Sequence, residues 1–143
     1  MITPDVNLLI YVHNASVSQH PRAFSWWHDL LSNEQPIGIP WAVVFGFIRL
    51  VTHPSVLVNP ITPGRALALA RSWLAREHVS ILEPGPRHLE IVAQLFAETG
   101  VAGRLTTDTH LAAIAIEYQT ELHTNDADFA RFPGLRHFNP LKT

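Results

Sequence analysis

Apolar residues along this chain follow two patterns that alternate. Short apolar runs are typical of buried strands, and they predict strands at 2–6, 79–82, 121–124 and 135–138. Between these runs apolar residues recur at helical spacing, which predicts helices at 7–13, 21–31, 41–51, 63–74, 86–98 and 108–118. Short strands that alternate with longer helices favour an α/β fold, with a mainly parallel sheet flanked by helices on both faces.

Prolines and glycines mark several boundaries in this pattern. Thr62 is a good N-cap with Pro63 in the first turn after it, whereas Pro54 disfavours helix at His53. The segment 35–40 alternates proline and glycine with apolar residues, so we expect a turn there with at most a very short strand. A length of 143 residues fits one domain over 1–143.

Composition narrows the classes of protein. The chain is 47% hydrophobic and 15% charged, which argues against disorder. It has no cysteine, which excludes disulfides and thiolate sites and suits a cytoplasmic location. Its apolar runs are too short to cross a bilayer, so we expect no membrane association. The net charge of −2 disfavours a strongly basic, non-specific nucleic-acid binder, although nine of the ten basic residues are arginines suited to phosphate.

Four of the five aspartates lie where one predicted element gives way to another. Asp5 and Asp126 are placed at strand carboxyl ends, Asp128 follows in the same connection as Asp126, and Asp108 is at the start of a helix. Each alone is equally well explained as a cap or turn residue. Ligands of parallel α/β sheets bind outside the strand carboxyl ends, so the coarse fold predicts that these acids converge. Clustered carboxylates repel one another unless a cation such as Mg²⁺ or Mn²⁺ neutralises them.

Other familiar chemistries are disfavoured. The nine histidines are scattered without a His-x-x-x-His pair, so a zinc site is not expected. The glycines form neither a P-loop nor a dinucleotide-binding pattern.

Four strings of sequence point together to a known family. They are Asp5-Val6-Asn7-Leu8-Leu9-Ile10-Tyr11, Pro40-Trp41 with Gly46-Phe47-Ile48-Arg49-Leu50-Val51-Thr52-His53-Pro54, Leu105-Thr106-Thr107-Asp108-Thr109-His110-Leu111, and Thr124-Asn125-Asp126-Ala127-Asp128-Phe129. In order and spacing the chain resembles PIN-domain ribonucleases, and more closely the VapC toxins of mycobacterial type.

This resemblance implies a PIN-like three-layer fold and a Mg²⁺-dependent endoribonuclease, with Mn²⁺ as an alternative ion. It also implies a toxin that is a homodimer and forms a hetero-oligomer with a VapB-type antitoxin. The catalytic acids map to Asp5, Asp108 and Asp126, which would bind metal together with Asp128, the last of these through a water.

The chain departs from the family pattern at its third helix. PIN domains commonly carry a glutamate there, near the position of Gly46, but this sequence has no acid between Glu34 and Glu77. The sequence therefore leaves open whether the site binds one metal ion or two. Arg49, Thr52, Thr107 and His110 are candidates for rim contacts to the substrate or the antitoxin, although Arg49 and Thr52 could instead form a salt bridge and a helix end.

Two alternative functions are left open. One is another Mg²⁺-dependent phosphohydrolase, which is disfavoured because no second acid follows Asp5 closely and the only lysine is Lys142. The other is a non-catalytic PIN-like module that binds RNA or a partner. The identity of the RNA does not follow from the sequence.

Overall fold

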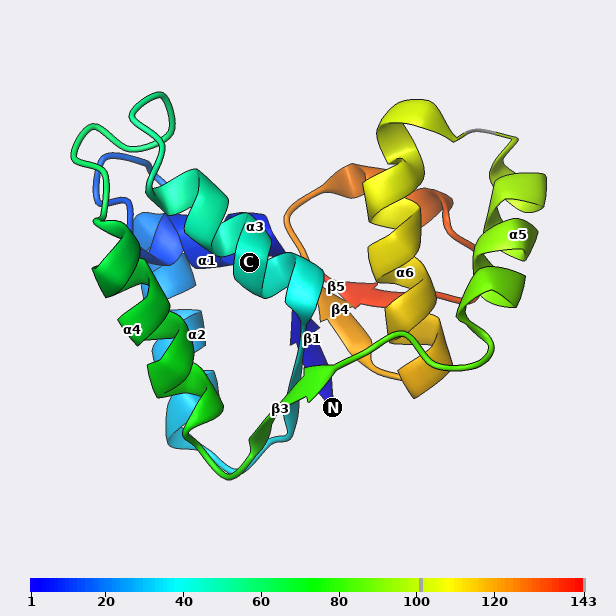
Figure 1. Ribbon diagram of the computed structural model, residues 1–143, viewed down its shortest axis with the longest axis horizontal. Coiled ribbons are helices and arrows are strands. Elements are labelled where there is room, and N and C mark those ends of the chain that lie inside the picture. The colour runs from blue at the N-terminus through cyan, green and yellow to red at the C-terminus, as the bar shows by residue number, and fades with distance from the viewer. Residues whose placement is uncertain (101, 143) are drawn as a thin grey trace.

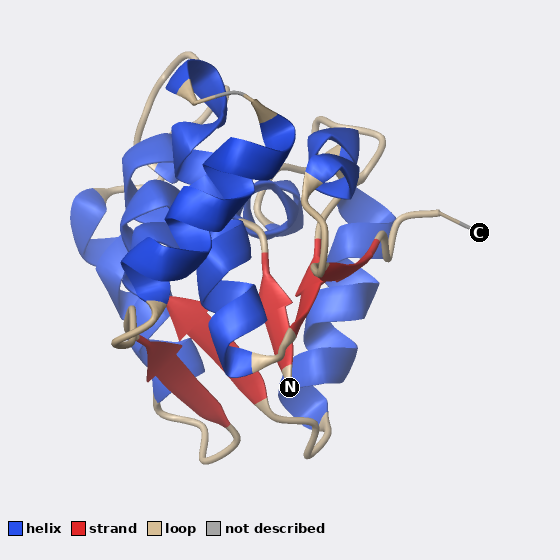
Figure 2. Cartoon of the chain, turned by 90° about the vertical axis from the view of Figure 1, so that its right-hand side faces the viewer, coloured by secondary structure: helices blue, strands red, loops and turns tan. Residues whose placement is uncertain are grey.

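The computed structural model describes residues 1–100 and 102–142 and contains a five-stranded sheet. The strand order is β3-β2-β1-β4-β5, and every neighbouring pair is parallel. Figure 2 shows the strands pointing in a common direction. Their bounds are β1 Ile2–Pro4, β2 Ile37–Pro40, β3 Val79–Leu82, β4 Glu121–His123 and β5 Arg136–Phe138.

Helices connect and cover the strands. They are α1 Val6–Val12, α2 His20–Ser32, α3 Trp41–Val51, α4 Pro63–Leu74, α5 His88–Thr99 and α6 Thr106–Tyr118, with 3₁₀ helices η1 Gly103–Leu105 and η2 Ala127–Arg131. In Figure 1, α1 to α4 lie in the left half of the molecule and α5 and α6 in its right half, where α6 crosses in front of β5. The predicted α/β fold with flanking helices is therefore confirmed.

The order of the strands determines where a ligand site can form. The chain steps outward from β1 through β2 to β3, and then returns to the other side of β1 to form β4 and β5. The connections diverge between β1 and β4, and a crevice outside the carboxyl ends of strands forms at such a switch point. Asp5 follows β1 and Asp126 follows β4 closely, so the topology brings both to this crevice.

The very short strand allowed for 35–40 is present as β2, a four-residue strand that lies between β1 and β3 in the sheet. Gly38 is required by packing: a Cβ built there would lie 2.7 Å from the Leu82 side chain and 2.7 Å from the Met1 sulfur. Pro40 is the last residue of β2 and also the N-cap of α3. The proline and glycine that indicated a turn are thus compatible with a short, fully buried strand.

The core lies mainly between the sheet and helices α1 to α4. Phe47 of α3 is fully buried, and its ring meets that of Trp73 edge-on at 4.7 Å. Trp27 of α2 packs perpendicular to Trp73 at 5.6 Å. Aromatic pairs in this arrangement contribute about 0.5–1.5 kcal/mol beyond their buried area. This cluster fixes α2, α3 and α4 against one another.

Among the described residues there is no helix that is both long enough and apolar enough to cross a membrane.

Candidate active site

Asp5 is a buried acid at the carboxyl end of β1. Its backbone N–H donates to the carbonyl of His123 on β4 at 2.9 Å, which fixes Asp5 at the switch point. The residue has an extended backbone and precedes α1, and it is only 6% exposed. The prediction that β1 continues to Val6 was wrong, because the helix begins there and Asp5 becomes its N-cap.

Thr124 connects Asp5 to the acids that follow β4. Its hydroxyl donates to Asp5 Oδ2 at 2.8 Å and accepts from the backbone N–H of Asp126 at 3.0 Å. Thr124 itself is buried. One hydroxyl group therefore holds two of the predicted catalytic residues in a defined relation.

Three further carboxylates form a cluster. One oxygen from each of Asp108, Asp126 and Asp128 lies within 4.8 Å of the others, and all three residues are partly exposed. Asp108 comes from the first turn of α6, and Asp126 is the N-cap of η2. Asp126 Oδ1 accepts from the Asp128 N–H at 2.9 Å, so the turn at the start of η2 keeps these two acids together.

Two arginines contact Asp128. Arg104 Nη1 lies 3.3 Å from Asp128 Oδ2, and Arg131 Nε lies 3.6 Å from Asp128 Oδ1. Both guanidinium groups are more than half exposed, so each pair is weakly stabilising. The two positive charges nevertheless offset the negative charge of Asp128 more directly than they offset the charges of Asp108 and Asp126.

The acids show the effect of burial and mutual repulsion. Burial raises the pKa of Asp5 to about 6, and the charges of Asp108 and Asp126 add to the increase, against the hydrogen bonds from Thr124 and Val6. Burial also raises the pKa of Asp108, with the charges of Asp126 and Asp128 acting in the same direction and Arg104 opposing them. The negative charge at this site is thus only partly compensated by the protein.

This donor set fits a hard divalent cation. Mg²⁺ and Mn²⁺ prefer carboxylate oxygens, and Asp108, Asp126 and Asp128 present three such groups together. Asp5 lies close enough for the charges of Asp108 and Asp126 to raise its pKa. The four acids named from the sequence are therefore brought together, and their roles remain a prediction.

Helix α3 contributes no acid to the site. Gly46 lies against α1, because a Cβ at this position would be 3.4 Å from the Val6 side chain. Where the family usually has a glutamate, this chain has a glycine that lets α1 and α3 pack closely together.

The four predicted rim residues have different environments. Arg49 is exposed and forms no ion pair with the described residues, so the alternative of a salt bridge is not seen. Thr52 caps α3 through a 2.8 Å bond from its hydroxyl to the Ile48 carbonyl. Thr107 is exposed at the start of α6. His110 Nδ1 lies 2.8 Å from His88 Nε2 on α5, and burial, with the His88 charge, lowers the pKa of His110. The rim roles stay predictions.

The sequence reasoning assigned no role to Thr124, Arg104 or Arg131. A threonine two residues before an aspartate after a strand is a common turn pattern, so Thr124 could have been identified from that spacing. Nothing in the local sequence of Arg104 indicates its contact with Asp128, because the two residues are 24 positions apart.

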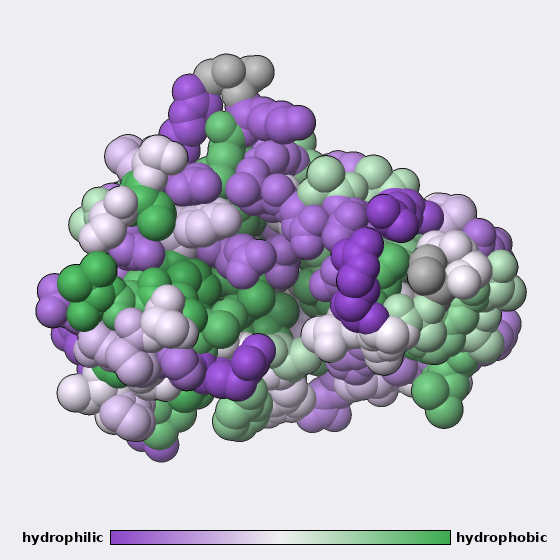
Figure 3. Space-filling view, turned by 90° about the horizontal axis from the view of Figure 1, so that it is seen from above, coloured by the Kyte–Doolittle hydropathy of each residue, from purple (hydrophilic) through white to green (hydrophobic). Residues whose placement is uncertain are grey.

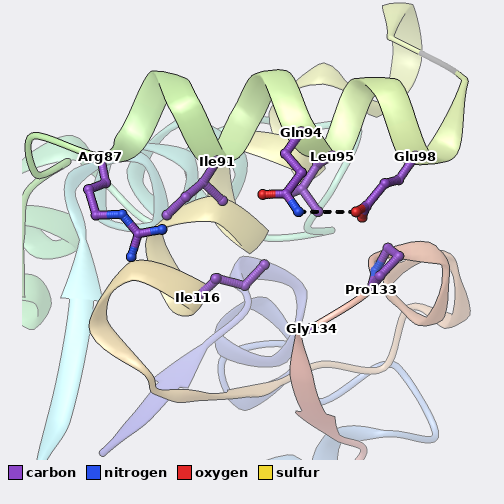
Figure 4. A pocket seen from close by; sticks show the side chains of 8 residues that line it. All are labelled: Arg87, Ile91, Gln94, Leu95, Glu98, Ile116, Pro133 and Gly134. Carbon is purple, nitrogen blue, oxygen red and sulfur yellow. Dashed lines mark hydrogen bonds between the residues drawn. The ribbon is translucent and has the colours of Figure 1, made fainter.

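A separate pocket of about 250 Å³ lies between α5, α6 and the segment before β5 (Figure 4). Ile91, Leu95 and Ile116 give it an apolar wall, and its one carboxylate, Glu98, accepts a hydrogen bond from Gln94. Ile116 is about 12 Å along α6 from Asp108 at the helical rise of about 1.5 Å per residue. This pocket therefore does not belong to the acidic cluster.

A family model described as PIN domain matches residues 2–135. The chain belongs to the PIN-domain family. Its relatives in this family include Ribonuclease VapC33 of Mycobacterium tuberculosis, which is 44% identical over 142 residues, covering 99% of each chain. Ribonuclease VapC37 of the same species is 31% identical, over 95% of this chain and 94% of the relative.

Solved structures show the same PIN fold at lower identity. The chain matches VapBC2 from Rickettsia felis, bound to a DNA fragment from its promoter, with a TM-score of 0.70 and 20% identity over 97% of this chain and 98% of that chain. It also matches VapC20 of Mycobacterium tuberculosis, a toxin that cleaves the sarcin-ricin loop, with a TM-score of 0.65 and 16% identity. This match covers 95% of this chain and 99% of that chain. These likenesses establish the fold, and the full-length relatives place the chain among VapC proteins.

Proposed function

We propose that this PIN domain is a metal-dependent endoribonuclease and the toxin of a VapBC-type toxin–antitoxin pair. The observation that carries the proposal is the cluster of Asp108, Asp126 and Asp128 beside buried Asp5 at the switch point of the sheet. Full-length relatives that are named ribonucleases support RNA as the substrate.

The acids would act in distinct ways. Asp108 and Asp126 would bind Mg²⁺ or Mn²⁺, and Asp128 would assist through a water because its charge is already partly offset by two arginines. When bound, such a cation neutralises charge on the phosphodiester and lowers the pKa of a water molecule. Asp5, with a pKa near 6, can complete the ligand set or accept a proton near neutral pH.

The partners follow from the same family. Solved neighbours include complexes named VapBC, so we propose a VapB-type antitoxin as the partner of this chain, with a homodimer as the form of the toxin alone. We also propose that it acts in the cytoplasm, where RNA is available.

Cleavage of total RNA tests the proposal. Purified protein with Mg²⁺ or Mn²⁺ is expected to produce discrete fragments with 5′-phosphate ends, and EDTA is expected to stop the reaction. Asp126→Asn should lower the rate at least a hundredfold, whereas Asp29→Asn on the exposed face of α2 should not change it. Metal binding without cleavage under any condition would instead favour a non-catalytic PIN-like module.

A further inference from the structure

A groove of about 410 Å³ lies between Asp126 of the acidic cluster and the C-terminal tail, and its lining combines polar side chains with the apolar Ala127 and Ala130. Asp126 lies in its wall, and Asn125, His137, Asn139 and Lys142 line it further along. The carboxyl ends of the strands point toward the face seen in Figure 3, where hydrophilic residues form a band between two more hydrophobic areas. The volume of the groove is within the range of about 300–1,000 Å³ that is usual for sites of small ligands.

We propose that this groove binds the RNA nucleotide next to the phosphodiester that is cleaved. In this subsite the Asn125 amide contacts the base and the Lys142 ammonium contacts a phosphate. The inference rests on the proposed ribonuclease function and extends it to the recognition of substrate.

The position of the groove supports this assignment. Asp126 belongs both to the acidic cluster and to the groove wall, so a ligand in the groove directly adjoins a phosphate at the cluster. In an RNA chain, the group attached next to that phosphate is the neighbouring nucleoside. The groove therefore receives a nucleotide without any change in the fold.

The orientation of the Asn125 amide follows from its hydrogen bonds. The backbone N–H of Leu141 donates to Asn139 Oδ1 at 2.9 Å, which leaves the Asn139 Nδ2 as a donor. That nitrogen donates to Asn125 Oδ1 at 2.9 Å. Asn125 consequently keeps two N–H donors and one free lone pair on Oδ1, the combination with which asparagine contacts adenine through paired hydrogen bonds.

Of the described residues that line the groove, Lys142 is the one lysine or arginine. Arg104 and Arg131 both contact Asp128. Lys142 is exposed and makes no ion pair with any residue in the described part of the chain. Its backbone N–H donates to the Asn139 carbonyl at 3.3 Å, so the tail folds back and keeps Lys142 at the groove. A phosphate close to several aspartates needs such a positive charge.

Binding of short RNA in EDTA tests the subsite without cleavage. The probes are fluorescein-labelled rA6, rC6 and rU6, measured by anisotropy at several salt concentrations. Lys142→Met should weaken binding of all three about three- to tenfold and lower the slope of log K against log salt by about 0.7, the value for one phosphate contact on a single strand. Arg71→Met, an exposed arginine of α4, is the charge-matched control and should leave both values unchanged.

Asn125→Ala should leave the salt slope unchanged and remove a preference for rA6 of about tenfold, since a good paired contact to a base contributes discrimination of roughly this size or more. Asn139→Ala should reduce the same preference, because it frees the Asn125 amide. Melting curves will show that the variants fold. Equal affinity of the wild type for all three probes, or an unchanged slope in Lys142→Met, would overturn the subsite.

The two proposals fail in distinguishable ways. RNA cleavage by the wild type together with unaltered RNA binding by Lys142→Met and Asn125→Ala would refute the subsite alone. Base-selective binding that depends on both residues, without cleavage in Mg²⁺ or Mn²⁺, would support the subsite and refute the ribonuclease.

Discussion

Asp5 is a buried acid whose charge opposes folding when no cation is bound. Its pKa is raised from 3.8 to about 6 in the folded protein, and a difference of this size corresponds to roughly 3 kcal/mol. Below pH 3.8 both the folded and the unfolded states bind the proton, so the cost is absent. As the pH rises to about 6 the unfolded state loses its proton first, and stability falls. Above pH 6 the full cost is present.

Asp5→Asn should therefore stabilise the protein in EDTA. At pH 7.5 the melting temperature should rise by several degrees, and the difference from wild type should disappear near pH 4. Thermal unfolding at both pH values checks this, with the exposed Asp29→Asn as the control. A variant that is less stable than wild type at both pH values would show that Asp5 stabilises the fold.

The role of the Thr124 hydroxyl can be tested by a single substitution. Thr124→Val keeps the shape but removes a donor to Asp5 and an acceptor for the Asp126 N–H. We expect a loss of about 1–3 kcal/mol in the free energy of unfolding, because buried groups lose their partners. The Thr124 hydroxyl lowers the pKa of Asp5, so its removal should also move the acidic limb of the pH–rate profile to higher pH.

Thr124→Ser keeps the hydroxyl and is the matched variant for this test. Its pH–rate profile should stay close to that of wild type. If the serine and valine variants behave alike, the methyl group of Thr124 rather than its hydroxyl is the important feature.

At the level of elements, strand β2 depends on a residue without a side chain. Gly38→Ala places a Cβ about 2.7 Å from side-chain atoms of Leu82 and Met1, so these two side chains must move. Overpacking of this kind costs about 1–3 kcal/mol. Urea denaturation measures the loss. Gly64→Ala in α4, where a Cβ meets nothing within 4 Å, is the control and should be neutral or stabilising by up to about 1 kcal/mol.

Most elements were predictable because their signals are local. Helix α3 and strand β3 have the predicted bounds, since apolar spacing and flanking prolines define both. Helix α5 begins at His88 rather than Pro86, which is within the usual uncertainty of helix ends. The sequence allowed at most a very short strand at 35–40 and did not place it inside the sheet, because the stability of β2 comes from its neighbours β1 and β3 and a single-sequence pattern contains no information about them.

The acids of the candidate site were predictable for a topological reason. Parallel strands carry their carboxyl ends to one edge, so Asp5 and Asp126 had to lie near each other once the strand order was set. The arginines at Asp128 and the amide pair of Asn125 and Asn139 depend on how loops fold back. Such contacts have no periodic signal in the sequence.

At the level of the whole molecule, metal binding and folding should be coupled. A cation that binds the folded state alone raises stability by about 2.7 kcal/mol at a concentration of a hundred times its dissociation constant. Mg²⁺ or Mn²⁺ should therefore raise the melting temperature of the wild type and have much less effect on Asp126→Asn. The shift should shrink below pH 6, because Asp5 and Asp108 have raised pKa values and protons compete with the metal.

Differential scanning fluorimetry with and without each ion, at pH 5 and pH 7.5, provides the measurement. Ca²⁺ is a useful comparison because it also binds oxygen ligands but accepts a less strict geometry. An equal metal-induced shift in wild type and Asp126→Asn would contradict the assignment of the cluster.

The hydrogen bond from Thr124 to Asp5 joins residues 119 positions apart in the chain. A ribosome makes Asp5 119 residues before Thr124, so the two residues can meet only after the segment between them has been synthesised. Chains usually fold from the N-terminus as they are made, and contacts of long sequence separation form late. A nascent or prematurely ended chain therefore lacks the complete acidic site. A cell that makes this protein is therefore exposed to the proposed ribonuclease activity only after Thr124 and the acids beside it have been synthesised.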